Sequence, residues 1–135
     1  MNRDDFQRLA EMRLSEGQAL FDAGFYSGAY YLSGYVIECA LKACICKQVQ
    51  QYDFPPGPDL KKSHYSHTFS ELVETADLKD VLRQEIAHNT AFERLWRILV
   101  VWRENKRYTY NVTEKEARDM LDAIREVYSW IQQYW

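Results

Sequence analysis

Residues 27–51 are the stretch that most constrains how this chain can fold. Between Tyr35 and Cys46 only Glu38 and Lys42 are charged, and they stand four residues apart in the order that favours an ion pair on a helix. Apolar and small residues follow more than one side of the stretch at helical spacing, and such a helix must be enclosed by others. We therefore predict a central helix with Glu38 and Lys42 as a structural ion pair. Small residues keep it slim enough for neighbours to approach closely: Gly28, Ala29, Ser33, Gly34, Ala40 and Ala43.

Length and composition indicate one domain. A chain of 135 residues can bury one substantial core and is too short for two. Hydrophobic residues make up 47% of it, and the few glycines and prolines (five and three) favour long helices with few turns. We predict a single domain over residues 1–135.

Several functional classes are disfavoured by composition. The N-terminus is charged from its third residue, unlike a signal peptide, and the longest apolar run, 98–102, is far too short to cross a bilayer. The net charge of −3 gives no general attraction to nucleic acid. The three cysteines, Cys39, Cys44 and Cys46, lie in one apolar stretch, as reduced core thiols do. We expect a cytoplasmic protein that binds neither membrane nor DNA.

Capping signals delimit the remaining helices. Thr68, Thr90 and Thr113 are each followed three residues later by Glu, the pattern of a capping box, and Asp77 is a further candidate cap. Residues 52–62 contain three prolines and should form a loop. With Gly24 as the first break, these signals predict helices over 4–23, 69–76, 78–88, 91–104 and 114–135.

The predicted fold class is all-α. The short turn after Gly24 makes the first helix antiparallel to the central one. Residues 97–102 have the composition of a strand, but capped helices flank them and no partner strand is available, so we assign them to a buried helix. We expect an antiparallel up-and-down helical bundle of four long helices plus one or two short helices.

Three motifs in order along the chain point to a known family. They are AYYLSGYVIECALKA at 29–43, SHTFSEL at 66–72 and WRENKRY at 102–108. Together they resemble the HEPN family, small helical domains named for nucleotide binding. The resemblance implies a homodimer of helical bundles. Some such domains are metal-independent ribonucleases or toxins with an Arg-x(4–6)-His motif, some partner a minimal nucleotidyltransferase, and others only bind ligands or proteins.

The nuclease motif of that family has two possible positions here. It usually precedes the last helix, where Arg103 is followed by Tyr108 in place of the histidine. Arg83 and His88 match the motif literally, and could clamp a phosphate and accept the proton of a ribose 2′-hydroxyl. Residues five apart on a straight helix point about 140° apart, so the pair converges only if the helix ends between them. A chance match, with His88 favourable at a helix C-terminus, is the alternative.

The segment 94–110 is the most basic part of the chain, with five Arg or Lys residues and one acid, Glu104. Guanidinium groups bind phosphate through paired hydrogen bonds, and aromatic rings stack on bases. Trp96 and Trp102 are interleaved with the basic residues, although they could equally be core. Given the resemblance, the candidate nucleotide- or RNA-binding residues are Arg103, Lys106, Arg107 and Tyr108.

Three hypotheses on function remain open. The first is a nucleotide- or RNA-binding homodimer that partners a nucleotidyltransferase in a toxin–antitoxin-type system. The second is a metal-independent ribonuclease, and the third is a protein interaction module. We expect no cofactor, because the chain has no Gly-rich phosphate loop. We expect no metal site either, because a cap at Thr68 leaves His64 and His67 outside the helix that carries Glu71.

Overall fold

The computed structural model describes residues 1–52 and 66–135, with side chains up to residue 49 in the first range. All regular structure in these two ranges is helical, which confirms the all-α class. The elements are α1 (Arg3–Asp22), α2 (Tyr26–Tyr52), α4 (Phe69–Thr75), α5 (Lys79–His88), α6 (Thr90–Val100), the 3₁₀ helix η1 (Glu104–Tyr108) and α7 (Glu114–Ile131). Most of the predicted proline-rich loop lies outside the described residues. None of the described helices combines the length and hydropathy of a membrane span.

The helix α2 lies at the centre of the fold, as its sequence predicts. It contacts α1 along one side, α7 along another, and α4 and η1 along a third. From residue 36 to residue 45 every side chain except Lys42 is buried. The enclosed central helix is therefore confirmed, and the hydrophobic core forms around it.

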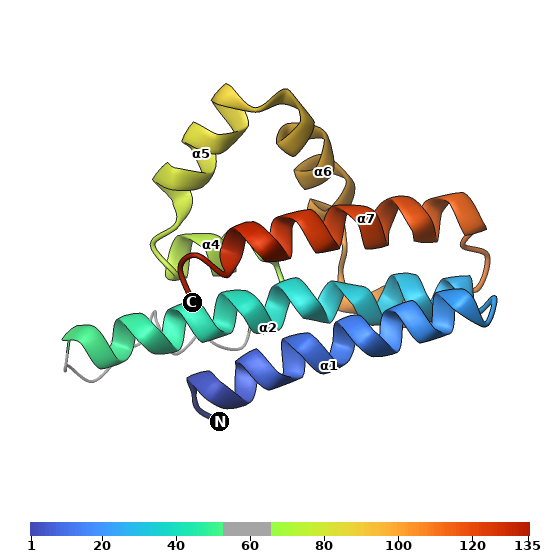
Figure 1. Cartoon of the computed structure of the whole chain (residues 1–135), viewed down its shortest axis with the longest axis horizontal. Helices are drawn as coiled ribbons and strands as arrows, with labels where there is room; N and C mark the ends of the chain where they lie inside the picture. The colour runs from blue at the N-terminus through green and yellow to red at the C-terminus, as the bar shows by residue number, and fades with distance from the viewer. Residues whose placement is uncertain (53–65) are drawn as a thin grey trace.

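The directions of the long helices differ from a strict up-and-down order. Figure 1 shows α1 antiparallel to α2, whereas α7 runs in the same direction as α2. Both α2 and α7 begin at one end of the molecule, where the Val112 amide donates to Ser27 Oγ at 3.1 Å. At the other end Arg3 Nη2 donates to the Trp135 carbonyl at 2.7 Å. The parallel pairing arises because α4, α5 and α6 carry the chain back to the start of α2 before α7 begins.

Only one of the three predicted threonine caps is observed. Thr113 forms the capping box of α7 with Glu116. At α6 the cap is Asn89, whose side chain accepts from the Phe92 amide at 3.0 Å, so Thr90 becomes the first helical residue. Thr68 stands at the predicted N-cap position of α4, but its side chain makes no capping hydrogen bond. Ser66 Oγ accepts from the Thr68 amide and donates to the Glu71 carboxylate, so Glu71 does not complete a capping box.

Two further helix boundaries were also wrong. Asp77 does not cap α5: it adopts a left-handed backbone conformation with φ of 58°, and Leu78 precedes the helix. The predicted helix over 91–104 ends at Val100, which leaves α6 with 11 residues beside 20, 27 and 18 in α1, α2 and α7. It ends early because the chain turns there to place Trp102 in the core.

Trp102 fits into a notch that Gly34 leaves on α2. The indole is fully buried, stacks on Phe69 at a centroid distance of 5.4 Å and donates from Nε1 to the Tyr31 carbonyl at 3.1 Å. A Cβ atom at Gly34 would lie 2.0 Å from the indole ring. Since no heavy atoms approach so closely, the absence of a side chain at position 34 is a condition for this packing.

We expect Gly34→Ala to destabilise the fold by about 2 kcal/mol or more, because Trp102 must leave its site or α2 must move. The measurement is the free energy of unfolding in urea. Gly28→Ala is the matched control: its Cβ would meet Leu20 Cδ1 at an ordinary 3.5 Å, so the better helix propensity of Ala should leave stability unchanged or raise it. Equal stability of both variants would contradict the role given to Gly34.

Candidate functional site

The 3₁₀ helix η1 holds three of the four predicted binding residues at or near the surface, and Arg103 precedes it. η1 packs against α2, because buried Trp102 fixes the chain immediately before it. The Arg103 guanidinium donates from Nη1 to the carbonyls of Val100 and Trp102, at 2.9 and 2.7 Å. It thereby satisfies carbonyl groups at the end of α6 while its side chain remains exposed.

Arg107 and Tyr108 form an exposed pair at the end of η1. The Arg107 guanidinium lies over the Tyr108 ring, 4.7 Å from its centroid, and donates from Nη2 to the Tyr108 hydroxyl at 2.9 Å. Tyr108 is 73% exposed. No carboxylate of the described residues lies within ion-pair distance of Arg107, so its charge is available to an anion.

Two tyrosines of α2 lie beside Arg107. The hydroxyls of Tyr31 and Tyr35 hydrogen-bond at 3.0 Å, and both rings pack against Trp102. Burial raises the pKa of Tyr35 strongly, the bond to Tyr31 raises it further, and the nearby Arg107 charge opposes both. The Tyr35 phenol therefore remains protonated at neutral pH, and its hydroxyl group lies near the Arg107 guanidinium, which has no acidic partner among the described residues.

One turn further along α2 lies a buried carboxylate. Glu38 is 3% exposed and accepts from Lys42 Nζ at 3.1 Å, so the ion pair that its spacing predicts is present. The same oxygen contacts Nδ1 of His67, from the segment that precedes α4. A carboxylate can only accept, so Nδ1 carries the hydrogen in this contact, and the ring nitrogen that does not face Glu38 is Nε2. His67 is only partly buried, so this nitrogen has access to solvent.

The tryptophans of the basic segment do not belong to this surface. Trp96 and Trp102 are buried and pack in the core, so of the two roles considered for them, ligand binding and core packing, the structure shows core packing. Tyr108 and Tyr110 are exposed instead. Base stacking at this site therefore depends on tyrosines alone.

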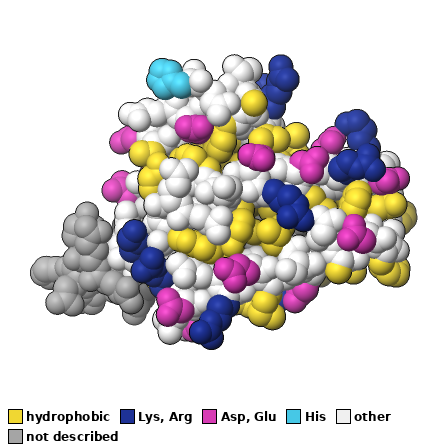
Figure 2. All heavy atoms as spheres, in the orientation of Figure 1, with side chains coloured by type: hydrophobic (Ala, Val, Ile, Leu, Met, Phe, Trp, Pro, Cys, Tyr) yellow, Lys and Arg dark blue, Asp and Glu magenta, His cyan; other side chains and the backbone are white. Residues whose placement is uncertain are grey.

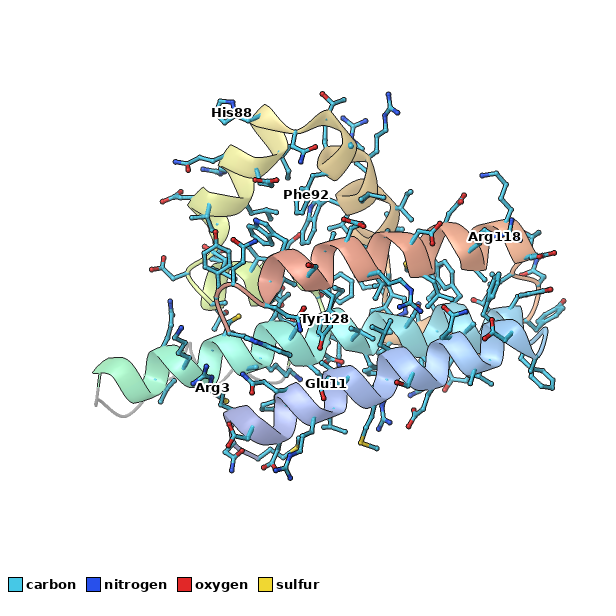
Figure 3. The ribbon with its side chains drawn as sticks, viewed as in Figure 1. Arg3, Glu11, His88, Phe92, Arg118 and Tyr128 are labelled. Carbon is cyan, nitrogen blue, oxygen red and sulfur yellow. The ribbon has the colours of Figure 1, made fainter. Side chains whose placement is uncertain are left out.

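Arg83 and His88 lie elsewhere and do not converge. Both are exposed on α5, which continues through His88, so the two side chains point about 140° apart. Figure 3 shows His88 at the outer end of α5. α5 packs on α6, whereas η1 packs on α2. The literal Arg-x4-His match is thus not assembled as a site within one chain.

The described residues contain no group of three His, Cys, Asp or Glu side chains that could hold a metal ion. His64 lies outside them. His67 and Glu71, which the sequence places near it, have other partners: Glu38 binds His67 and Ser66 binds Glu71.

Sequence reasoning did not assign Tyr31, Tyr35 or His67 to the site. His67 is 29 residues from Glu38 in the chain, and no local spacing reveals their contact. The two tyrosines follow a helical period of four, which suits core residues equally well. One feature of the sequence could have indicated that His67 lies near the central helix: SHTFSEL and the central helix both belong to the motifs that resemble the family.

The comparison with protein families agrees with this arrangement. The family model described as HEPN domain matches residues 4–134, nearly the whole length of the chain. The chain belongs to the HEPN domain family. Neither the curated proteins nor the solved structures gave a significant match.

We expect Glu38→Gln to destabilise the fold by about 3 kcal/mol, because it removes the negative charge that pairs with the largely buried Lys42 and leaves only an uncharged amide oxygen to accept from His67. The measurement is the free energy of unfolding at neutral pH.

The matched control for Glu38→Gln is Asp119→Asn. Asp119 pairs with Lys115, also four residues away, but the two side chains are 41% and 81% exposed. Its loss should change stability by less than about 0.5 kcal/mol. A similar small change at Glu38 would contradict a structural role for the buried carboxylate.

Proposed function

We propose that this HEPN domain binds a nucleotide or RNA through η1 and the adjoining side of α2. Arg107 contacts phosphate, Arg103 and Lys106 add positive charge, and Tyr108 contacts a base or sugar. The observation that carries the proposal is the exposed Arg107 without an acidic partner among the described residues, beside three tyrosine hydroxyls.

The distribution of charge supports a local site. Basic side chains of α6 and α7 form pairs with acids one turn away, such as Arg97 with Glu93 and Arg118 with Glu114. On the face shown in Figure 2, Lys and Arg alternate with Asp and Glu and form no continuous basic surface. Duplex binding depends on many phosphate contacts over a broad basic surface. The η1 site itself offers only Arg103, Lys106 and Arg107 as basic side chains, so the ligand proposed here is a nucleotide or a single-stranded segment.

The partners of this module are part of the proposal. We propose a cytoplasmic homodimer that acts as an accessory to a nucleotidyltransferase in a toxin–antitoxin-type system. Membership of the HEPN family supports this direction, and sedimentation of the purified chain would test the dimer. If the chain binds neither a nucleotide nor RNA, the function that remains is that of a protein interaction module.

We expect Arg107→Ala to weaken nucleotide binding by about tenfold or more, because a charge-assisted hydrogen bond to phosphate is lost. Calorimetry with AMP and with a short single-stranded oligoribonucleotide measures the change, and circular dichroism checks that helix content is intact.

The matched control is Arg94→Ala, which removes the same charge from an exposed position on α6. It should leave the dissociation constant unchanged. If Arg107→Ala has no more effect than Arg94→Ala, the phosphate role of Arg107 is wrong.

The contact between Glu38 and His67 favours a second candidate function, metal-independent cleavage of RNA. Nε2 of His67 would take the proton of a ribose 2′-hydroxyl, the 2′-oxygen would attack the phosphorus, and the bond to the 5′-oxygen would break, leaving a 2′,3′-cyclic phosphate. Water would protonate the departing 5′-oxygen.

The placement of the groups supports this step. Glu38 fixes the His67 ring through Nδ1, and Tyr35, three residues before Glu38, lies near Arg107. The α2 residues that His67 and Arg107 adjoin, Glu38 and Tyr35, are three positions apart and so lie on the same side of α2, about one helical turn apart.

For this second function we expect His67→Gln to lower the rate of RNA cleavage in EDTA by about 100-fold or more, the usual contribution of a general base. His88→Ala should leave the rate unchanged, because His88 lies at the far end of α5. The readout is the release of cyclic phosphate ends from a labelled RNA. If cleavage is lost in His88→Ala but not in His67→Gln, the active site is the Arg83–His88 pair. If the unmodified protein does not cleave RNA at all, the ribonuclease function is excluded.

A further inference from the structure

A groove between α1 and α2 adjoins the proposed phosphate site. It has a volume of about 500 Å³ and runs between Leu9, Arg13 and Glu16 of α1 and Tyr31, Leu32 and Tyr35 of α2. Cavities that bind small molecules in proteins range from about 300 to 1,000 Å³. The groove is therefore large enough for one planar ring system with its sugar.

The tyrosine wall of the groove is rigid. Tyr31 and Tyr35 meet edge to face at 5.4 Å, their hydroxyls are hydrogen-bonded, and Trp102 supports both rings from the core side. A wall that is already ordered loses little conformational entropy when a ligand binds. The groove is thus preorganised on this side, and Leu9 and Leu32 add apolar surface to it.

The opposite wall carries polar groups that suit the edge of a base. Arg13 Nη1 binds both carboxylate oxygens of Glu16, at 3.0 and 2.9 Å. The pair is partly exposed, and the guanidinium keeps further N–H donors while the carboxylate keeps free lone pairs. It thus offers donors and acceptors side by side without adding net charge to the groove.

The charges distinguish the two ends of the groove. Arg107 belongs to η1, which follows Trp102 and packs on α2, and Trp102 contacts both Tyr31 and Tyr35, so the positive charge of Arg107 lies on the tyrosine side of the groove. Arg13, at the other wall, is neutralised by Glu16. An occupant with an anionic group at one end and an uncharged planar ring at the other matches this pattern.

We infer that the α1–α2 groove is a nucleobase pocket, and that the ligand of this protein is a nucleoside monophosphate or an unpaired terminal nucleotide of RNA, with its phosphate on Arg107. The inference rests on the proposed function and extends it, because it adds Arg13 and Leu32 to the binding site and assigns the rings of Tyr31 and Tyr35 to the base. A second copy of the chain, which could also cover the groove, is an outcome of the test.

The test compares AMP with ribose 5-phosphate, which has the sugar and the phosphate but no base. By calorimetry AMP should bind about tenfold more tightly or better, because stacking and burial of the base add to the phosphate contact. Leu32→Trp should fill the groove and abolish this difference while ribose 5-phosphate binds as before. Leu9→Trp, which enters the groove from the α1 wall, should also abolish the difference in affinity between the two compounds. Ala19→Trp, at an exposed position of α1 outside the groove, should leave that difference unchanged.

The possible failures are distinguishable. Equal affinities for AMP and ribose 5-phosphate in the unmodified protein would overturn the base pocket and leave the phosphate site standing. A difference that survives both Leu32→Trp and Leu9→Trp would place the base elsewhere. If these variants instead convert a dimer into a monomer in sedimentation, a second copy occupies the groove. Binding of neither compound would remove the pocket, and the proposed function falls with it if the single-stranded oligoribonucleotide does not bind either.

Discussion

The contact between Trp102 and Gly34 is the constraint on which the rest of the structure depends. It pins the chain between α6 and η1 to the middle of α2, because the indole fits only where α2 has no side chain. The hydrogen bond from the indole to the Tyr31 carbonyl fixes its orientation. Every feature of the candidate site follows from this contact, since η1 can bring Arg107 to Tyr31 and Tyr35 only if Trp102 holds it there.

A second constraint is the buried carboxylate of Glu38. An unpaired carboxylate at this depth would be strongly unfavourable, so Lys42 and His67 must both remain close to it. The contact with Lys42 is local to α2, whereas the contact with His67 joins α2 to the segment before α4. The polar cluster therefore has a structural function whether or not His67 also takes part in chemistry, and its position one turn from Tyr35 is what gives it a possible second role.

The overall charge of the chain and the charge of its site are separate quantities. A net charge of −3 does not attract nucleic acid, and several surface arginines are matched by acids one helical turn away. At η1 the pattern changes, because Arg103 binds backbone carbonyls and Arg107 lies on an aromatic ring. Neither contact neutralises a positive charge, so both guanidinium groups keep theirs, which supports the local anion site proposed above on an acidic protein.

The sequence by itself determined the helical class, the enclosed central helix, the ion pair of Glu38 with Lys42 and the capping box at Thr113. These depend on contacts within a few residues, where the helical period converts spacing into position. Only the tertiary structure decided the other features: that α7 runs parallel to α2, that Asn89 rather than Thr90 caps α6, that Trp102 belongs to the core, and that His67 contacts Glu38. They are contacts between distant segments, and they depend on how the helices pack, which no spacing within one segment specifies.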